Sequence, residues 1–496
     1  MPVPQEILDV KRPVNTVVFV YGVNKDKYGV RQRVGCVRVN GKNRPVNGPT
    51  VGHIVNGVYV PNKEVIPRLN CSEVELKYWG NVYLCDRLMQ DILEELQLIY
   101  NPQDAYTLYC IMILRVCEPG IKDYELKDMY DCSFLSELYP GIGLSKNTVC
   151  EFWQDLGKAY SKITKFMRNR ADNIKLDHHV LIDGTLKSNE SEVNTLSNFS
   201  RKAKTKGTRD ISVLYAFDLE QMEPICSQCF PGNMLDATSY EDFISNNHIQ
   251  RGIIVADKGF PASGAKSHFD KNPELHYMNP LKRNSKYIEK YKLYEYDGLL
   301  NGYENISYKV VFCQEENKWL YSFRDAWKSG KEERDYLSRA KKKGNYSDHE
   351  FRNKWMEFGT VILECDYQMS AEIAYKTYES RWQIEIVMRF YKSACEFDET
   401  RVHNDYSVHG SEFCDFLSTL LTFRLLNFFD EKGILLDMTY KQTMKVLKRA
   451  QKVKDDGNWK LIKMNPGQME QLSKMELITP LSNTPKRKPG RPKKSI

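Results

Sequence analysis

The stretch from Tyr378 to Lys392 carries four side chains whose spacing could bring them together for chemistry. They are Tyr378, Arg381, Glu385 and Lys392. A helix turns by about 100° per residue, so all four would lie within an arc of about 60°. The neighbouring stripe is apolar and predicts a buried face: Ile384, Val387, Met388, Tyr391 and Cys395. A simple ion pair between Arg381 and Glu385 on a solvated face is the alternative interpretation.

Two aspartates stand at the ends of similar apolar runs. One run, 179–183, reads His-Val-Leu-Ile-Asp and is followed by Gly184; the other, 252–257, reads Gly-Ile-Ile-Val-Ala-Asp. Each run predicts a buried strand that ends in an acid, although Asp183-Gly184 could equally be a surface turn after a strand. With helical spacing between the runs, the pattern predicts a mixed α/β sheet with a site at its edge.

A long insertion separates Asp257 from Glu385. Their separation of 128 positions exceeds what one strand-helix connection requires. Residues 286–324 alternate apolar and polar side chains and predict a β-rich part, whereas residues 326–355 are charged and helical in spacing, with a break at the Lys-Lys-Lys-Gly of 341–344.

The four-residue pattern Tyr-x2-Arg-x3-Glu-x6-Lys resembles the "YREK" signature of the DDE transposases of bacterial insertion sequences. Asp183, Asp257 and Glu385 are similar in order and context to the three catalytic acids of that group, and the β-rich insertion before the Glu is also typical of it. The resemblance implies an RNase H-like mixed-sheet catalytic core. We name residues 378–392 the signature helix.

The resemblance also implies a chemistry. Three carboxylates at one sheet edge repel one another unless a cation lies between them. Two Mg²⁺ ions about 4 Å apart, with Mn²⁺ as a substitute, would be held by Asp183, Asp257 and Glu385. The reaction would be hydrolysis at the ends of an insertion sequence and joining of the 3′-OH to target DNA. Tyr378, Arg381 and Lys392 would bind DNA phosphates.

Other functions remain open at this point. An RNase H-like nuclease could carry the same acids, and a DNA-binding regulator could derive from a transposase. The implied partners are double-stranded DNA, as transposon ends and target, and a second copy of the chain in a synaptic complex.

The charge of the chain is concentrated at its C-terminus. Six of the seven net positive charges fall in residues 485–496, around the Pro-Gly-Arg-Pro of 489–492. This tail resembles an AT-hook, in which Arg487 and Arg491 would lie in a narrow A·T minor groove; a generic basic tail is the alternative. A second DNA contact is predicted at a helix capped by Ser145, whose first residues are Lys146, Asn147 and Thr148.

Composition limits the location of the protein. The chain is 41% hydrophobic without a run of 18 apolar residues, and its start lacks the pattern of a signal peptide, so no membrane association is expected. Thirteen scattered cysteines indicate reduced thiols, and we expect a cytoplasmic, nucleoid-associated protein. The Cys226-x-x-Cys229 pair could bind zinc or could be two small apolar residues of a strand.

The sequence predicts seven segments. They are a small β-rich module (1–65), a helical DNA-binding region (66–175), the first part of the core (176–260), a β-rich then helical insertion (261–377), the second part of the core with the signature helix (378–430), a C-terminal helical region (431–480) and the basic tail (481–496).

Overall fold

A computed structural model describes most of the chain in two compact units. The described residues are 3–22, 27–39, 42–62, 75–200, 207–234, 236–256, 265–381 and 399–479. The smaller unit comprises Met1–Glu75 and Val453–Asn458, and the larger unit the remainder. No helix in these ranges is both long and apolar enough to cross a membrane.

The smaller unit is a four-stranded antiparallel sheet in the order β1-β2-β3-β4. Its elements are α1 (Gln5–Leu8), β1 (Thr16–Tyr21), β2 (Lys27–Val39), β3 (Lys42–Val55) and β4 (Val58–Pro61). Asn56 and Gly57 both have positive φ, 51° and 74°, as a two-residue turn between β3 and β4 requires. Val18, Val30 and Ile54 form its small core.

The larger unit is built on a mixed sheet whose centre has the order β9-β8-β6-β10-β11. These strands are β6 (His179–Ser188), β8 (Arg209–Asp218), β9 (Glu223–Pro231), β10 (Gly252–Ala256) and β11 (Leu275–Pro280). The pairs β6–β8 and β8–β9 are antiparallel, whereas β10 is parallel to both β6 and β11. Three antiparallel strands followed by two strands parallel to the first form the predicted RNase H-like core.

The insertion lengthens this same sheet. Strand β15 (Thr360–Cys365) pairs antiparallel with β11 and continues into β14 (Lys318–Asp325), β13 (Ile306–Cys313) and β12 (Gly298–Leu299). Helix α12 (Ala326–Lys343) ends at Gly344 in the left-handed conformation, φ 65°, where the sequence predicted a break. The remaining elements of the sheet and insertion are β7 (Asn198–Phe199), α9 (Asp236–Asn246), α10 (Lys266–Lys271), α11 (Lys286–Lys290), α13 (Asp348–Lys354) and η2 (Trp355–Glu357).

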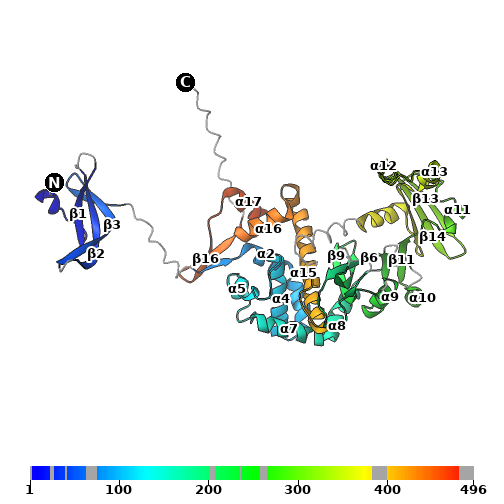
Figure 1. The fold of residues 1–496 in the computed structure, drawn as a ribbon, viewed down its shortest axis with the longest axis horizontal. Helices are drawn as coiled ribbons and strands as arrows, with labels where there is room; N and C mark the ends of the chain where they lie inside the picture. The colour runs from blue at the N-terminus through cyan, green and yellow to red at the C-terminus, as the bar shows by residue number, and fades with distance from the viewer. Residues whose placement is uncertain are drawn as a thin grey trace, which may run out of the picture. The chain divides into compact units, whose positions relative to one another are not determined.

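A layer of helices packs around the long helix α15 (Asp405–Glu431). Residues of α15 are buried on every side, because it contacts β9 and the helices α2, α4, α7 and α8 (Figure 1). The helices and the short strand that precede the core are β5 (Leu76–Tyr78), α2 (Gly80–Leu88), α3 (Gln90–Gln97), α4 (Pro102–Cys117), α5 (Leu126–Asp131), α6 (Leu135–Leu138), α7 (Lys146–Lys158) and α8 (Tyr160–Ala171).

Two glycines allow α7 and α15 to approach closely. A Cβ added to Gly157 would lie 1.8 Å from the carbonyl oxygen of Tyr406, and one added to Gly410 would lie 2.3 Å from that of Trp153. The backbones of the two helices are therefore in direct contact at this crossing.

The elements after α15 include a hairpin that the sequence analysis did not predict. They are η3 (Ile434–Leu436), α16 (Tyr440–Arg449), β16 (Gln451–Asp455), β17 (Asn458–Leu461) and α17 (Pro466–Lys474). Asp456 and Gly457 connect β16 to β17 with positive φ of 47° and 79°. Asp-Gly is a strong short-range hairpin signal, so this turn was readable from the sequence.

Candidate active site

Asp183 lies inside strand β6. The strand continues to Ser188, and its pairing with β8 runs unbroken through Asp183↔Tyr215 and Gly184↔Leu214. The alternative of a surface Asp-Gly turn is therefore wrong, because pairing with β8 on one side keeps the backbone extended. The Asp183 carboxylate is half-buried, and its Oδ1 accepts a hydrogen bond of 2.9 Å from the Gly184 amide.

The neighbouring strand β10 ends beside Asp183. Its parallel register with β6 pairs Val255 with Leu181 and Ala256 with Ile182. Asp183 directly follows Ile182, and Asp257 directly follows Ala256 in the sequence. Asp257 itself lies outside the described residues.

Tyr378, at the start of the signature helix, lines a cavity at the end of β11. Val255 pairs with Met278 of β11 as well as with Leu181, so Pro280, two residues after Met278, is level with Asp183. Tyr378 lines a cavity of about 100 Å³ together with Pro280. Two strand spacings separate β6 from β11, which is about 10 Å.

The signature helix is described only as far as Arg381. Residues 371–381 are helical, as the spacing predicted, and the Arg381 guanidinium carbon lies 5.9 Å from the Tyr378 ring centroid. Glu385 and Lys392 lie outside the described residues, as do Arg487 and Arg491 of the tail.

A buried ion network stands four residues beyond Asp183, on the same face of β6. The Lys187 amine contacts Glu412 Oε2 at 2.6 Å and Asp415 Oδ2 at 2.8 Å, and both acids belong to α15. Arg115 of α4 donates a hydrogen bond of 2.7 Å to the other Asp415 oxygen. The network joins α4, β6 and α15, so it fixes the helical layer against the strand that carries Asp183.

Burial and charge act against each other in this network. Burial lowers the pKa of Lys187, but Asp415 and Glu412 outweigh it and hold that pKa well above its ordinary value. Burial raises the pKa of Glu412, with Lys187 opposing the rise. These residues were not predicted from the sequence, although two acids three positions apart within the apolar stretch of α15 are a signal of a buried charge pair.

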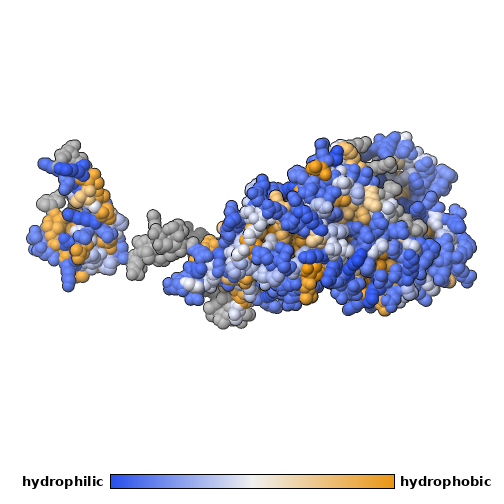
Figure 2. All heavy atoms as spheres, turned by 90° about the horizontal axis from the view of Figure 1, so that it is seen from below, coloured by the Kyte–Doolittle hydropathy of each residue, from blue (hydrophilic) through white to orange (hydrophobic). Residues whose placement is uncertain are grey.

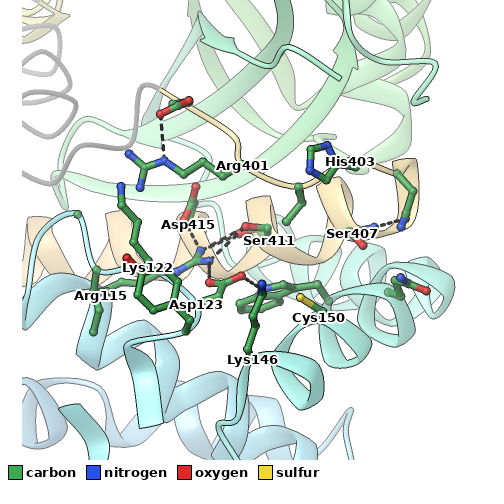
Figure 3. Close-up of a pocket in the computed structure, with 18 residues that line it drawn as sticks. Arg115, Lys122, Asp123, Lys146, Cys150, Arg401, His403, Ser407, Ser411 and Asp415 are labelled. Atoms are coloured by element: carbon green, nitrogen blue, oxygen red, sulfur yellow. Dashed lines mark hydrogen bonds and ion pairs between the residues drawn. The ribbon is translucent and has the colours of Figure 1, made fainter. Parts of the chain in front are cut away.

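A cavity of about 590 Å³ opens beside the network (Figure 3). Figure 3 shows the Arg115 guanidinium between Asp123, Ser411 and Asp415, with Lys146 of α7 and Arg401 of the segment before α15 also lining the cavity. Arg401 Nε lies 2.9 Å from Glu399, so this cation is already paired. The cavity thus carries both signs of charge at its lining.

The predicted DNA-binding helix begins at this cavity. Ser145 caps α7 as predicted, accepting a hydrogen bond of 3.4 Å from the Thr148 amide. Lys146, Asn147 and Thr148 are exposed on its first turn. DNA contact by these three side chains stays a prediction.

A second group of possible metal ligands lies at the opposite end of β6. One ligand atom each from His178, Asp218 and Glu220 falls within 4.8 Å of the others. The Asp218 Oδ1 atom accepts hydrogen bonds from the Glu220 and Gln221 amides, and Glu220 accepts one from the His179 amide. These bonds fix the turn between β8 and β9, and the group is distinct from the Asp183 site.

The arrangement of Cys226 and Cys229 fits two small apolar residues of a strand and does not fit a zinc site. Both thiols are free and buried in strand β9. Residues three apart in a strand point to opposite faces, so the two sulfurs cannot converge on one zinc ion. Burial raises the pKa of both thiols, which favours the neutral, apolar form.

The region that contains Asp183 matches a known protein family. Residues 175–410 match the family described as the transposase DDE domain. This DDE-domain region begins just before β6 and extends into α15, and in sequence it contains Asp257 and the signature helix. The match supports a transposase.

Other comparisons give weaker likenesses. No curated protein matches the chain. A piggyBac transposase synaptic complex with hairpin DNA has a TM-score of 0.39 at 11% identity, covering 75% of this chain and 80% of that chain. A Mos1 transposase paired-end complex with the left transposon end has a TM-score of 0.15 at 14% identity, covering 32% of this chain and 58% of that chain.

Proposed function

We propose that the protein is a DNA transposase of the YREK insertion-sequence group, which cuts at the ends of its element and joins the 3′-OH to target DNA. The observation that carries the proposal is the register between β6 and β10. Asp183 and Asp257 each directly follow a residue of the pair Ile182↔Ala256. Two acids of a shared site require such a register, because parallel neighbouring strands are about 4.8 Å apart.

The donor set suits a hard divalent cation. Carboxylate oxygens are the ligands that Mg²⁺ and Mn²⁺ prefer, and the described member, Asp183, is a half-buried carboxylate on the RNase H-like sheet. Asp183, Asp257 and Glu385 would hold two Mg²⁺ ions, which lower the pKa of an attacking water or 3′-hydroxyl and stabilise the leaving oxygen.

The cations and the phenol of the signature helix have a positioning role in this proposal. Arg381 would bind a DNA phosphate through two parallel N–H groups, and Lys392 through a point charge. Tyr378 would donate a hydrogen bond from its hydroxyl to a phosphate oxygen. Tyr378 lines the same small cavity as Pro280, which is level with Asp183 two strands away, and this supports the role.

Substitution of the three acids tests the proposal. In Asp183→Asn, Asp257→Asn and Glu385→Gln, cleavage of a duplex carrying an element end should fall at least about 100-fold, which is about 2.7 kcal/mol in the barrier. Binding of the same duplex should remain, since each change removes a metal ligand and not a phosphate contact. Single-turnover cleavage and a binding titration measure the two.

Asp270→Asn is the matched control, because Asp270 is an exposed acid of helix α10, which packs against β11, and among the described residues it pairs with Lys266. It should cleave as the wild type does. Full cleavage by any one of the three acid variants contradicts the role of that acid. Cleavage without joining of the 3′-OH to a second duplex contradicts the transposase and indicates a nuclease.

A further inference from the structure

The hairpin of β2 and β3 extends as an exposed arm from the small N-terminal sheet. Its strands pair antiparallel from Tyr28↔Ile54 to Val39↔Lys42. Residues 31–38 of β2 and 42–47 of β3 are all exposed, so neither face of the outer part of this arm is covered. We name the segments 31–39 of β2 and 42–50 of β3, which contain these exposed residues, the β-arm.

The charge of the sheet is of one sign. The strands β1 to β4 contain no aspartate or glutamate. Six exposed cations lie on β2 and β3: Lys27, Arg31, Arg33, Arg38, Lys42 and Arg44. Among the described residues of the chain, no salt bridge involves any of the six. Uncompensated cations on an exposed ribbon indicate a polyanionic partner.

The shape of the β-arm suits a groove. Nine residues of strand span about 30 Å at roughly 3.3 Å per residue. The register shifts between Val30 and Gly35 mark β-bulges, which increase the right-handed twist of a ribbon. The major groove of B-DNA, about 12 Å wide, admits a two-stranded β-ribbon.

Apolar side chains share the surface of the β-arm with these cations. Val34 is 59% exposed and Val37 is 52% exposed, and Val37 lies directly across from Arg44 on the same face. Figure 2 shows hydrophobic and hydrophilic side chains intermixed on the surface of this small unit. In the major groove, the methyl group of thymine offers an apolar contact for the valines, and the backbone phosphates offer an anion for the cations.

We propose that the β-arm is a DNA-binding element that enters the major groove of duplex DNA, with Arg33, Arg38, Lys42 and Arg44 on the flanking phosphates. The proposal rests on the function proposed above only in taking DNA as the polyanion. It assigns a DNA contact to the N-terminal module, separate from the DDE-domain region, from the helix capped by Ser145 and from the basic tail.

Removal of the four cations in the full-length protein tests the proposal. The variant R33Q/R38Q/K42Q/R44Q should bind a 40-base-pair duplex at least tenfold more weakly near 0.1 M salt. The slope of log K against log salt concentration should fall by about 2 to 4, since each phosphate contact contributes about 0.9. The melting temperature should not change, because all four side chains are exposed.

Two matched variants distinguish the effect of cations in the β-arm from the effect of the total charge of the protein. K175Q/K271Q/K441Q/K445Q removes four exposed cations from the larger unit and should change the slope by less than 1. R33K/R38K/R44K keeps the charge of the β-arm and should keep most of the slope. Equal loss of affinity in the two glutamine variants overturns the proposal, as does unchanged binding in R33Q/R38Q/K42Q/R44Q.

Two further readouts separate this proposal from the others. Distamycin, a minor-groove ligand, should not displace the β-arm from duplex DNA. If distamycin lowers the DNA affinity of the wild type but not that of R33Q/R38Q/K42Q/R44Q, the major-groove assignment is refuted. A wild-type protein that binds duplex through the β-arm but never cleaves it would contradict the transposase and leave the β-arm proposal standing.

Discussion

At the residue scale, the face of β6 that carries Asp183 also carries the buried amine of Lys187. The Asp183 side chain is half-buried, whereas the Lys187 amine is enclosed by the acids of α15. Lys187 and Arg115 together balance the two charges of Glu412 and Asp415, so these two acids do not add to the negative charge at the neighbouring site. Strand β6 therefore carries the candidate catalytic acid, Asp183, and also the lysine that holds the structural acids of α15.

Lys187→Met should destabilise the fold strongly. Removing one partner from a buried ion pair leaves an uncompensated charge and costs about 3–5 kcal/mol. The raised pKa means that the contribution of Lys187 is fully present below its unfolded value of about 10.4 and is lost only as pH rises through the higher folded value. Urea unfolding at pH 7 measures it.

Lys158→Met provides the comparison for that experiment. Lys158 pairs with Asp155 at 2.9 Å, but its side chain is 55% exposed. Its loss should change stability by less than about 1 kcal/mol. Equal effects of the two substitutions would show that the Lys187 network is not a stabilising contact.

At the element scale, local signals in the sequence predicted local structure. The Ser145 cap of α7 and the end of α12 at Gly344 are both set by residues within one turn of the helix. The Lys187 network could not be predicted in the same way, because it joins β6 to an acid 228 positions away. The β6–β10 register is likewise a long-range property, although the apolar runs predicted both strands.

The crossing of α7 and α15 gives a test at this scale. Alanine is the better helix former by about 1 kcal/mol, so Gly410→Ala would stabilise an isolated helix. In this fold the added Cβ meets the Trp153 carbonyl oxygen at 2.3 Å. Because the backbones must separate, we expect a net loss of about 1–3 kcal/mol in the free energy of unfolding.

Gly330→Ala in α12 is the matched control for that crossing. Nothing lies within 4 Å of an added Cβ at this exposed helical position. This substitution should raise stability by up to about 1 kcal/mol, as thermal melting would show. A gain at both positions would mean that α7 and α15 do not touch at Gly410.

At the scale of the whole molecule, the two units have different chemistry. The small N-terminal sheet carries cations without acids and no buried polar network among its described residues. The larger unit holds the RNase H-like sheet, the helical layer and the match to the transposase DDE domain. We interpret the first as a DNA-holding module and the second as the catalytic one. The residue types predicted the catalytic role and a β-rich N-terminal module, whereas the role of that module, the sheet order and the register required the structure.

The central claim is that Asp183 is a metal ligand, and a change of ligand chemistry tests it most directly. Asp183→Cys replaces a hard oxygen ligand by a softer sulfur, which binds Mn²⁺ better than Mg²⁺. Single-turnover cleavage of an end-containing duplex would be measured in each metal, with the wild type as reference. We expect activity at least about 100-fold below wild type in Mg²⁺ and a relative recovery of tenfold or more in Mn²⁺. Equal loss in both metals, or wild-type cleavage in Mg²⁺, would contradict it.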